Sequence, residues 1–296
     1  MKKHVYLIAG AFLVALASCK EVGPKIDFGG GAASGDDTTY VAEKVEAPQQ
    51  KKVLAEEFTG VSCPTCPPGH STMKGIQSTL NNNLVIMGCH IFNNPQSKPV
   101  DKPGHESEQD FRTEDATELL SAIYGSLKEG IPSAGFDRMP INGEALNTKG
   151  KWSDAANNRT VVAAPVNIYI TTSYDNTTRE AVAIVKIAYT KETTVKQNLT
   201  VAVTEDEITD TQLDGLNIID DYKHEHVLRD IVTPVTGATL PVKVEPRVAG
   251  RVYQRTFRFK IDAKWKPEHC NVIAFVNTDE GANKEVVQAE EVKLIP

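Results

Sequence analysis

Two cysteines separated by two residues are the group in this sequence best suited to chemistry. Cys63 and Cys66 enclose Pro64 and Thr65. A thiolate attacks a disulfide to give a mixed disulfide, and a second thiol close by then resolves it. A Cys-X-X-Cys pair can therefore carry out thiol–disulfide exchange, with Cys63 as the nucleophile and Cys66 as the resolving thiol.

A structural role for the same pair is the first alternative. In the chain-entropy model, a disulfide across so short a loop stabilises a protein by about 2 kcal/mol, against about 3 kcal/mol for a loop of roughly fifteen residues. The short spacing between Cys63 and Cys66 therefore favours redox chemistry over a structural cross-link.

Metal binding is the second alternative. Cys63, Cys66, His70 and His90 have side chains of the kinds that bind zinc. The cysteines are expected on an exposed loop, however, whereas His90 belongs to an apolar stretch. The segment His224-Glu225-His226 would place two imidazoles on one face of a strand, but it lacks an evident third ligand. We expect neither a metal nor another cofactor.

The cysteine pair lies at the junction of a predicted strand and a predicted helix. Residues 53–58 are mostly apolar and predict a strand, residues 70–80 carry apolar side chains on one helical face, and residues 84–92 form a second apolar run. A strand, a helix and a further strand indicate a βαβ unit with a parallel sheet.

The start of that helix decides how much it can assist Cys63. A helix beginning at Cys63 would place the sulfur at the positive end of the helix dipole, which favours the thiolate. It would also place Pro67 and Pro68 inside the helix, where proline is disfavoured. In the alternative, Pro67 lies in the first turn and Cys63 lies on the preceding loop.

A proline loop follows later in the chain. After a polar stretch at residues 93–112 and a helix signalled by Thr113, the chain reads Ile131-Pro132-Ser133. Together with the strand, the Cys-X-X-Cys pair and the two helices, this order resembles the thioredoxin superfamily. Ser62 departs from the aromatic residue that usually precedes the first cysteine of that superfamily.

The resemblance implies roles for four further residues. Pro132 would follow a cis peptide bond, which is plausible only before proline, and it would face the disulfide. Ile131 and Ser133 would line the groove for a substrate chain. Glu57 stands where the superfamily has a buried acid that helps to move a proton at the second cysteine, here Cys66.

The second half of the chain has a different pattern. From Val166 onwards, apolar residues alternate with polar ones in about seven short segments separated by turns. This predicts an antiparallel, immunoglobulin-like β-sandwich without a catalytic constellation. The expected fold is therefore an α/β thioredoxin-like domain at residues 51–160, followed by an all-β immunoglobulin-like sandwich at residues 161–296.

The first 50 residues predict export and anchoring. Lys2 and Lys3 precede an apolar run from Val5 to Ala17, which is too short to span a bilayer and indicates a signal peptide at residues 1–19. The end of that run resembles a lipobox, which would make Cys19 the acylated N-terminus in contact with outer-membrane lipid. Residues 20–50 are rich in glycine and poor in apolar residues, which predicts a disordered tether.

Charge and the two remaining cysteines complete the picture. The net charge of −7 offers no positive field for phosphates, so we expect no nucleic-acid partner. Cys89 and Cys270 lie in apolar segments, where a free cysteine usually behaves as a small buried hydrophobe. A bridge between them in an oxidising envelope is the alternative.

The chain after residue 50 resembles envelope lipoproteins related to a twenty-eight-kilodalton outer-membrane protein. The resemblance is carried by residues 56–60 with both cysteines, 130–132, 226–229, 272–276 and 287–289. It implies an outer-membrane location. Two functions remain open: thiol–disulfide exchange on exported proteins, or adhesin-type binding by a lipoprotein with an inert disulfide.

Overall fold

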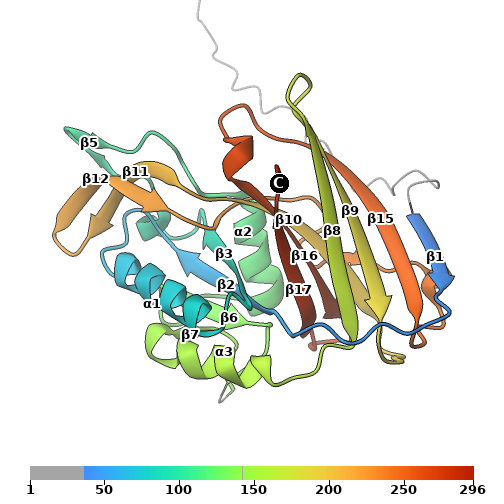
Figure 1. Ribbon diagram of the computed structural model, residues 1–296. Coiled ribbons are helices and arrows are strands. Elements are labelled where there is room, and N and C mark those ends of the chain that lie inside the picture. Colours follow the sequence, from blue (N-terminus) through green and yellow to red (C-terminus); the bar gives the residue numbers. More distant parts are fainter. Residues whose placement is uncertain (1–36, 142) are drawn as a thin grey trace, which may run out of the picture.

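The computed structural model describes residues 37–141 and 143–296 (Figure 1). The predicted signal peptide, the lipidation site at Cys19 and residues 20–36 of the predicted tether lie outside the described residues.

The first half builds a four-stranded sheet flanked by helices. The sheet order is β3-β2-β6-β7, with β2 and β3 parallel and each of the other neighbours antiparallel. The elements are β2 (Val53–Thr59), α1 (Cys66–Thr79), β3 (Leu84–His90), α2 (Glu114–Leu119, continued by a π-helical turn at Leu120–Tyr124), β6 (Ser133–Phe136), β7 (Asn147–Thr148) and α3 (Trp152–Thr160).

Helices cover both faces of this sheet. Every residue of β2 and β3 is buried, as expected for parallel strands enclosed on two sides. Met73 and Ile76 of α1 pack with Trp152 of α3 on one face, and Leu119 of α2 packs on the other. Helix α1 begins at Cys66 after Thr65, with Pro67 in its first turn, so the second of the two predicted helix starts is the correct one.

The second half continues the same sheet. Strands β17 (Val286–Lys293), β16 (Cys270–Thr278), β10 (Gln197–Glu205) and β13 (Val227–Ile231) extend it beyond β3, and β14 (Ala238–Thr239) pairs with β10. The link is the parallel pairing of β13 with β3 at Val227 and Gly88. The predicted boundary near residue 160 therefore separates two segments of sequence but not two sheets.

A second sheet packs on this extension to form a sandwich. Its order is β1-β15-β9-β8, from β1 (Asp37–Val41), β15 (Arg251–Lys260), β9 (Glu180–Tyr189) and β8 (Val166–Asp175). Val185 and Ile187 of β9 meet Val201 of β10 and Val272 of β16 in one apolar core. The antiparallel sandwich predicted for this half is present, but one of its two sheets is shared with the first half.

The predicted tether is wrong for residues 37–50. Asp37–Val41 pair with β15, and the Gln49 side chain exchanges hydrogen bonds with the backbone of Ile168 in β8. The short run Thr38-Thr39-Tyr40-Val41 is rich in β-branched and aromatic residues, which favour a strand, and its pairing with β15 outweighs the glycine-rich sequence before it.

Two hairpins project at the end of the sheet near the start of α1 (Figure 1). One joins β4 (Asp101–Lys102) to β5 (His105–Glu106), and the other joins β11 (Ile208–Asp214) to β12 (Asn217–His224). The remaining elements are 3-10 turns at Pro95–Ser97, Lys149–Lys151, Val242–Val244 and Pro267–His269.

Candidate functional site

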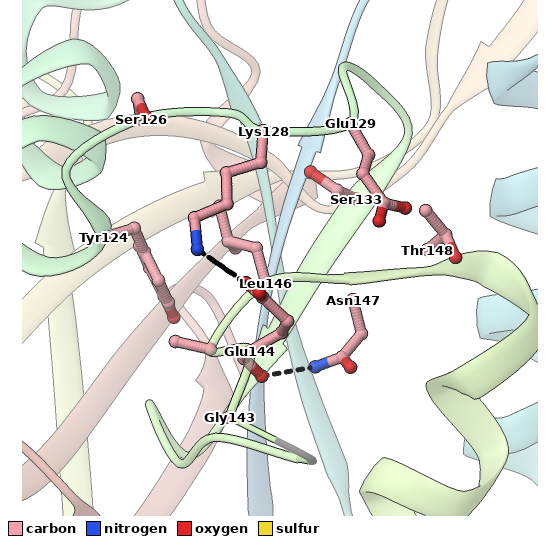
Figure 2. A pocket seen from close by; sticks show the side chains of 11 residues that line it. Tyr124, Ser126, Lys128, Glu129, Ser133, Gly143, Glu144, Leu146, Asn147 and Thr148 are labelled. Carbon is pink, nitrogen blue, oxygen red and sulfur yellow. Dashed lines mark hydrogen bonds and ion pairs between the residues drawn. The ribbon is translucent and has the colours of Figure 1, made fainter.

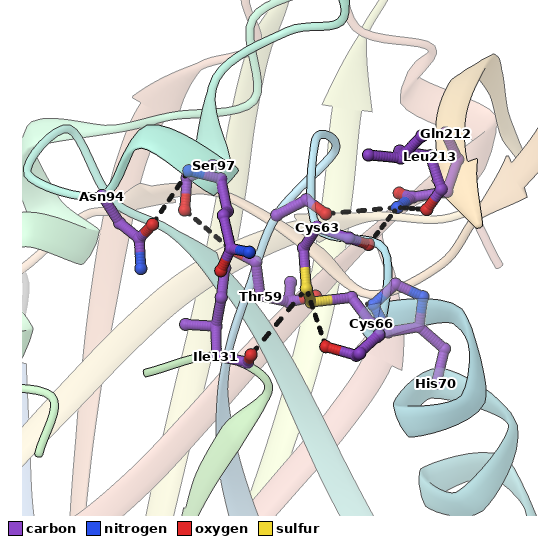
Figure 3. The surroundings of a disulfide bond; sticks show 12 residues. Thr59, Cys63, Cys66, His70, Asn94, Ser97, Ile131, Gln212 and Leu213 are labelled. Carbon is purple, nitrogen blue, oxygen red and sulfur yellow. Dashed lines mark hydrogen bonds between the residues drawn. A yellow bond between two sulfur atoms is a disulfide. The ribbon is translucent and has the colours of Figure 1, made fainter. Parts of the chain in front are cut away.

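The two cysteines of the pair form a disulfide at the carboxyl end of β2. Their Cα atoms are 5.4 Å apart, and Cys66 is the first residue of α1 while Cys63 lies on the preceding loop (Figure 3). Both residues are 0% exposed. The helix dipole therefore acts more directly on Cys66 than on the predicted nucleophile.

The proline loop lies against this disulfide. The Ile131–Pro132 peptide bond is cis, and the Sγ atom of Cys63 contacts the carbonyl oxygen of Ile131 at 3.9 Å (Figure 3). The loop also packs closely on α1, because a Cβ atom added at Gly69 would lie 3.0 Å from Cγ of Pro132. Glycine at position 69 allows the helix and the proline loop to approach this closely.

Adjacent carboxyl groups on β2 have opposite surroundings. Glu56 is paired: it accepts hydrogen bonds from Arg138, the closest at 2.8 Å, and from the Tyr124 hydroxyl at 2.5 Å. Glu57 points to the other face, and its buried Oε1 atom has no hydrogen-bond partner. Burial raises the pKa of Glu57 to about 8, so its carboxyl group is mostly neutral at pH 7.

A hydrogen-bond chain that the sequence analysis missed runs beside Glu57. His70, one turn after Cys66, bonds the Thr59 hydroxyl through Nε2 at 2.7 Å and the Tyr222 hydroxyl through Nδ1 at 2.8 Å. Burial, and secondarily the nearby His224 and His226, lowers the pKa of His70. The imidazole is therefore neutral, with one donor and one acceptor nitrogen.

A cavity of about 330 Å³ opens next to this chain. Glu57 lies at its floor between α1 and β12, and Lys74 and Lys223 stand at its exposed rim. Because His70 and Tyr222 also line it, the cavity links the buried carboxyl group to the surface.

The loop that carries Cys63 is held from two sides. The stretch at residues 93–112 supplies one side: Ser62 donates its N–H to the carbonyl of Gln96, and Ser97 donates its hydroxyl to the carbonyl of Thr59. Hairpin β11–β12 supplies the other, since the Gln212 amide donates to the carbonyls of Gly60 and Cys63 (Figure 3).

The residues predicted to line a substrate groove are covered. Ile131 is 8% exposed and Ser133 is 4% exposed. Ser133 borders a cavity of about 160 Å³ between the proline loop and β7 (Figure 2), and the buried Ser133 Oγ and Asn147 Oδ1 atoms have no hydrogen-bond partner. The cavity near the proline loop thus lies between Ser133 and β7, whereas on the other side the carbonyl of Ile131 contacts the disulfide.

The other two described cysteines are free and buried. Cys89 packs in the core that contains the disulfide, and Cys270 packs in the core of the sandwich. Burial raises the pKa of both thiols, that of Cys270 to about 12. The bridge considered between them is not formed, and neither environment favours a reactive thiolate.

The zinc alternative does not fit the geometry around the pair. The sulfur atoms of Cys63 and Cys66 are bonded to each other. Within residues 37–141 and 143–296, no three His, Cys, Asp or Glu side chains are grouped so that they could hold a metal ion. His224 ends β12 and His226 lies beyond it with a positive φ, so the two imidazoles do not share a strand face as expected.

Two solved structures share the fold. HBP35 of Porphyromonas gingivalis matches with a TM-score of 0.63 and 19% identity, over 84% of this chain and 77% of that chain. Protein AGR_C_4864 from Agrobacterium tumefaciens matches with a TM-score of 0.51 and 13% identity, over 84% and 96%. At these identities the likeness concerns fold alone. No curated protein matches the sequence.

A family model gives the identity of the chain. Residues 120–294 match the family described as outer membrane protein Omp28, which agrees with the resemblance noted in the sequence. No helix in the described part of the chain is long and apolar enough to cross a membrane. The matched segment covers more than half of the sequence, and the chain belongs to the Omp28 outer membrane protein family.

Proposed function

We propose that this protein carries out thiol–disulfide exchange on exported proteins, held at the outer membrane by lipid on Cys19. In this proposal residues 51–160 are a thioredoxin-like module, and the sandwich spaces the module or binds the partner. The strand order β3-β2-β6-β7 and the cis bond before Pro132 support the assignment of the module. The immunoglobulin-like topology of the sandwich stays a prediction.

The unpaired carboxyl group of Glu57 is the observation that carries the proposal. A buried acid without a hydrogen-bond partner destabilises a fold, so a purely structural disulfide gives no reason to retain one. Perturbed groups of this kind concentrate at functional sites. Glu56, which is equally buried, shows that the same strand can hold a fully paired carboxylate.

The exchange step uses only groups of this chain and the substrate. In the reduced protein the Cys63 thiolate attacks one sulfur of a substrate disulfide, and the other substrate sulfur leaves as a thiolate. In the minority of molecules in which Glu57 is ionised at pH 7, a fraction that grows towards pH 8, Cys66 then passes its proton to Glu57 and attacks Cys63 Sγ, which releases the second substrate thiolate. The substrate gains two electrons and the pair becomes the disulfide seen here; the reverse sequence oxidises a substrate.

A second candidate is favoured by one specific observation. Both cysteines are 0% exposed, as in an inert structural disulfide. The protein would then be an adhesin-type binding lipoprotein that retains the fold without the chemistry.

The reduction potential of the Cys63–Cys66 pair separates the two candidates. Exchange predicts a value between about −120 and −270 mV, and an inert disulfide predicts one below about −300 mV. Cys66→Ala should trap mixed disulfides with exported proteins, while Cys63→Ala is the matched control that should trap none. A potential below −300 mV together with no trapped adducts would reject the proposed function.

A further inference from the structure

Strand β11 lies along the loop that carries the disulfide. Leu213 donates its N–H to the carbonyl of Val61, and Gly215 donates its N–H to the carbonyl of Pro64, each at 2.9 Å. Together with the two bonds from the Gln212 amide, the loop accepts hydrogen bonds from an extended strand more than 140 residues away in sequence. A strand of this chain thus occupies the backbone edge beside the cysteines.

The outer part of the hairpin makes few other contacts, and none of them buries a residue completely. Residues 213–221 include no buried residue, and Leu216 at the tip is fully exposed. The base is different: Ile208 packs in a small apolar cluster with Val61 and Phe111, and His224 is buried. Segments with few buried apolar contacts are those that open locally while the rest of a protein stays folded.

A break in the pairing separates the outer part from the base. The register of β11 and β12 shifts between Asp210 and Gln212, as at a β-bulge, and bulges disrupt the ladder and bend a strand. Tyr222 pairs with Asp210 on the base side of this shift and is hydrogen-bonded to His70 of α1. On the outer side, Ile218 packs on the small apolar cluster, and the Asp220 carboxylate lies 2.8 Å from Nδ1 of His105 at the surface. Opening at the bulge would break the two bonds from Leu213 and Gly215 and the contacts of Ile218 and Asp220, while Tyr222 and the base stay in place.

We propose that residues 213–221 form a lid that must move away from the Cys63–Cys66 loop before the disulfide can react. The lid would account for the complete burial of both cysteines, although they lie at the carboxyl end of β2 near the surface. The inference deepens the proposed function, on which its biological meaning rests, by naming what controls access to the site.

The test compares how fast tris(2-carboxyethyl)phosphine reduces the disulfide in three full-length proteins. The phosphine takes oxygen from water to become the phosphine oxide, and the two sulfurs become thiols that alkylation and mass spectrometry can count. In the first variant Asn-Gly replaces residues 213–218 and joins Gln212 to Ile219, which are paired in register and so accept a two-residue turn. Leu216→Ala, at the exposed tip, is the matched control.

The shortened hairpin should be reduced at least about tenfold faster than the natural protein, because two hydrogen bonds to the loop are lost. Leu216→Ala should match the natural protein. Equal rates in all three proteins would overturn the lid. Amide hydrogen exchange of the natural protein provides a second measurement that requires no variant: the N–H groups of Leu213 and Gly215 should exchange faster than those of β2, and exchange only on global unfolding would also overturn it.

The test of the lid and the test of the proposed function can fail independently of each other. Rapid reduction of the shortened variant supports the lid even when Cys66→Ala traps no exported protein, a result that would count against exchange alone. Trapped adducts combined with equal reduction rates would support exchange and reject the lid.

Discussion

The Oε1 atom of Glu57 lies 4.0 Å from the Nε2 atom of His70, one helical turn beyond Cys66. These two groups would form an ion pair if both were charged. Burial instead raises the pKa of Glu57 and lowers that of His70, so both are neutral near pH 7. In their neutral forms neither group places an unpaired charge in the buried space beside the disulfide.

Replacing Glu57 by Gln should change how stability depends on pH. The pKa of Glu57 is about 8 in the folded protein and about 4.3 in an unfolded chain, so its contribution is complete below pH 4 and is lost as the pH rises towards 8. Relative to Glu57→Gln, the natural protein should lose roughly 3 to 5 kcal/mol of unfolding free energy between pH 4 and pH 9. Urea unfolding of both oxidised proteins measures this, and parallel pH profiles would contradict it.

Arg138→Met should be strongly destabilising. The Arg138 side chain is 1% exposed and pairs with fully buried Glu56, so its removal leaves a buried charge with only the Tyr124 hydroxyl as partner. The expected loss in unfolding free energy is about 3 to 5 kcal/mol. Lys128→Ala removes a comparable pair, with Glu144, at the surface and should change stability by less than about 1 kcal/mol. A similar effect of both substitutions in urea unfolding would refute the role of burial.

Two glycines in α1 should respond in opposite ways to alanine. A Cβ at Gly69 would meet Pro132 at 3.0 Å and Trp152 at 3.3 Å, whereas a Cβ at Gly75 would meet nothing within 4 Å. Gly75→Ala should raise the unfolding free energy by up to about 1 kcal/mol through helix propensity. Gly69→Ala should lower it by about 1 to 3 kcal/mol, since the proline loop must shift. Thermal unfolding of the pair provides the comparison, and equal stabilisation would show that the loop is not tightly packed.

Cys19→Ser should abolish acylation. We expect the protein with Cys19 to incorporate labelled palmitate and to fractionate with membranes, because two or three acyl chains anchor a protein stably. The serine variant should do neither, and Cys270→Ser should behave as the natural protein. Labelling of the Cys19→Ser protein would disprove this anchor site.

Local features of the site could be predicted because short-range physics determines them. The apolar runs predict β2 and β3, and Pro67 sets the start of α1 because proline is tolerated only in a first turn. The alternation along β2 implies that Glu56 and Glu57 face opposite sides. It does not reveal which one has a partner, because Arg138 reaches Glu56 from a residue far along the chain.

Long-range features could not be predicted in the same way. The contact of Gln212 with the loop at Gly60 joins residues 152 apart, and the pairing of Tyr40 with Val252 joins the N-terminal segment to β15. Periodicity indicates that a strand exists and which face is apolar, but not which edge it meets. The contact of hairpin β11–β12 with the cysteine loop and the pairing of the N-terminal segment with β15 therefore could not be predicted from the sequence.

The pairing of β13 with β3 has a consequence for any attempt to divide the protein. Gly88 donates its N–H to the carbonyl of His226 at 2.7 Å, and this contact protects the outer side of β3. A fragment ending at residue 160 would leave β3, whose residues are all buried and mostly apolar, as an unpaired strand edge, which is a template for self-association. We therefore expect the half that carries the cysteines to self-associate when it is produced without the C-terminal half.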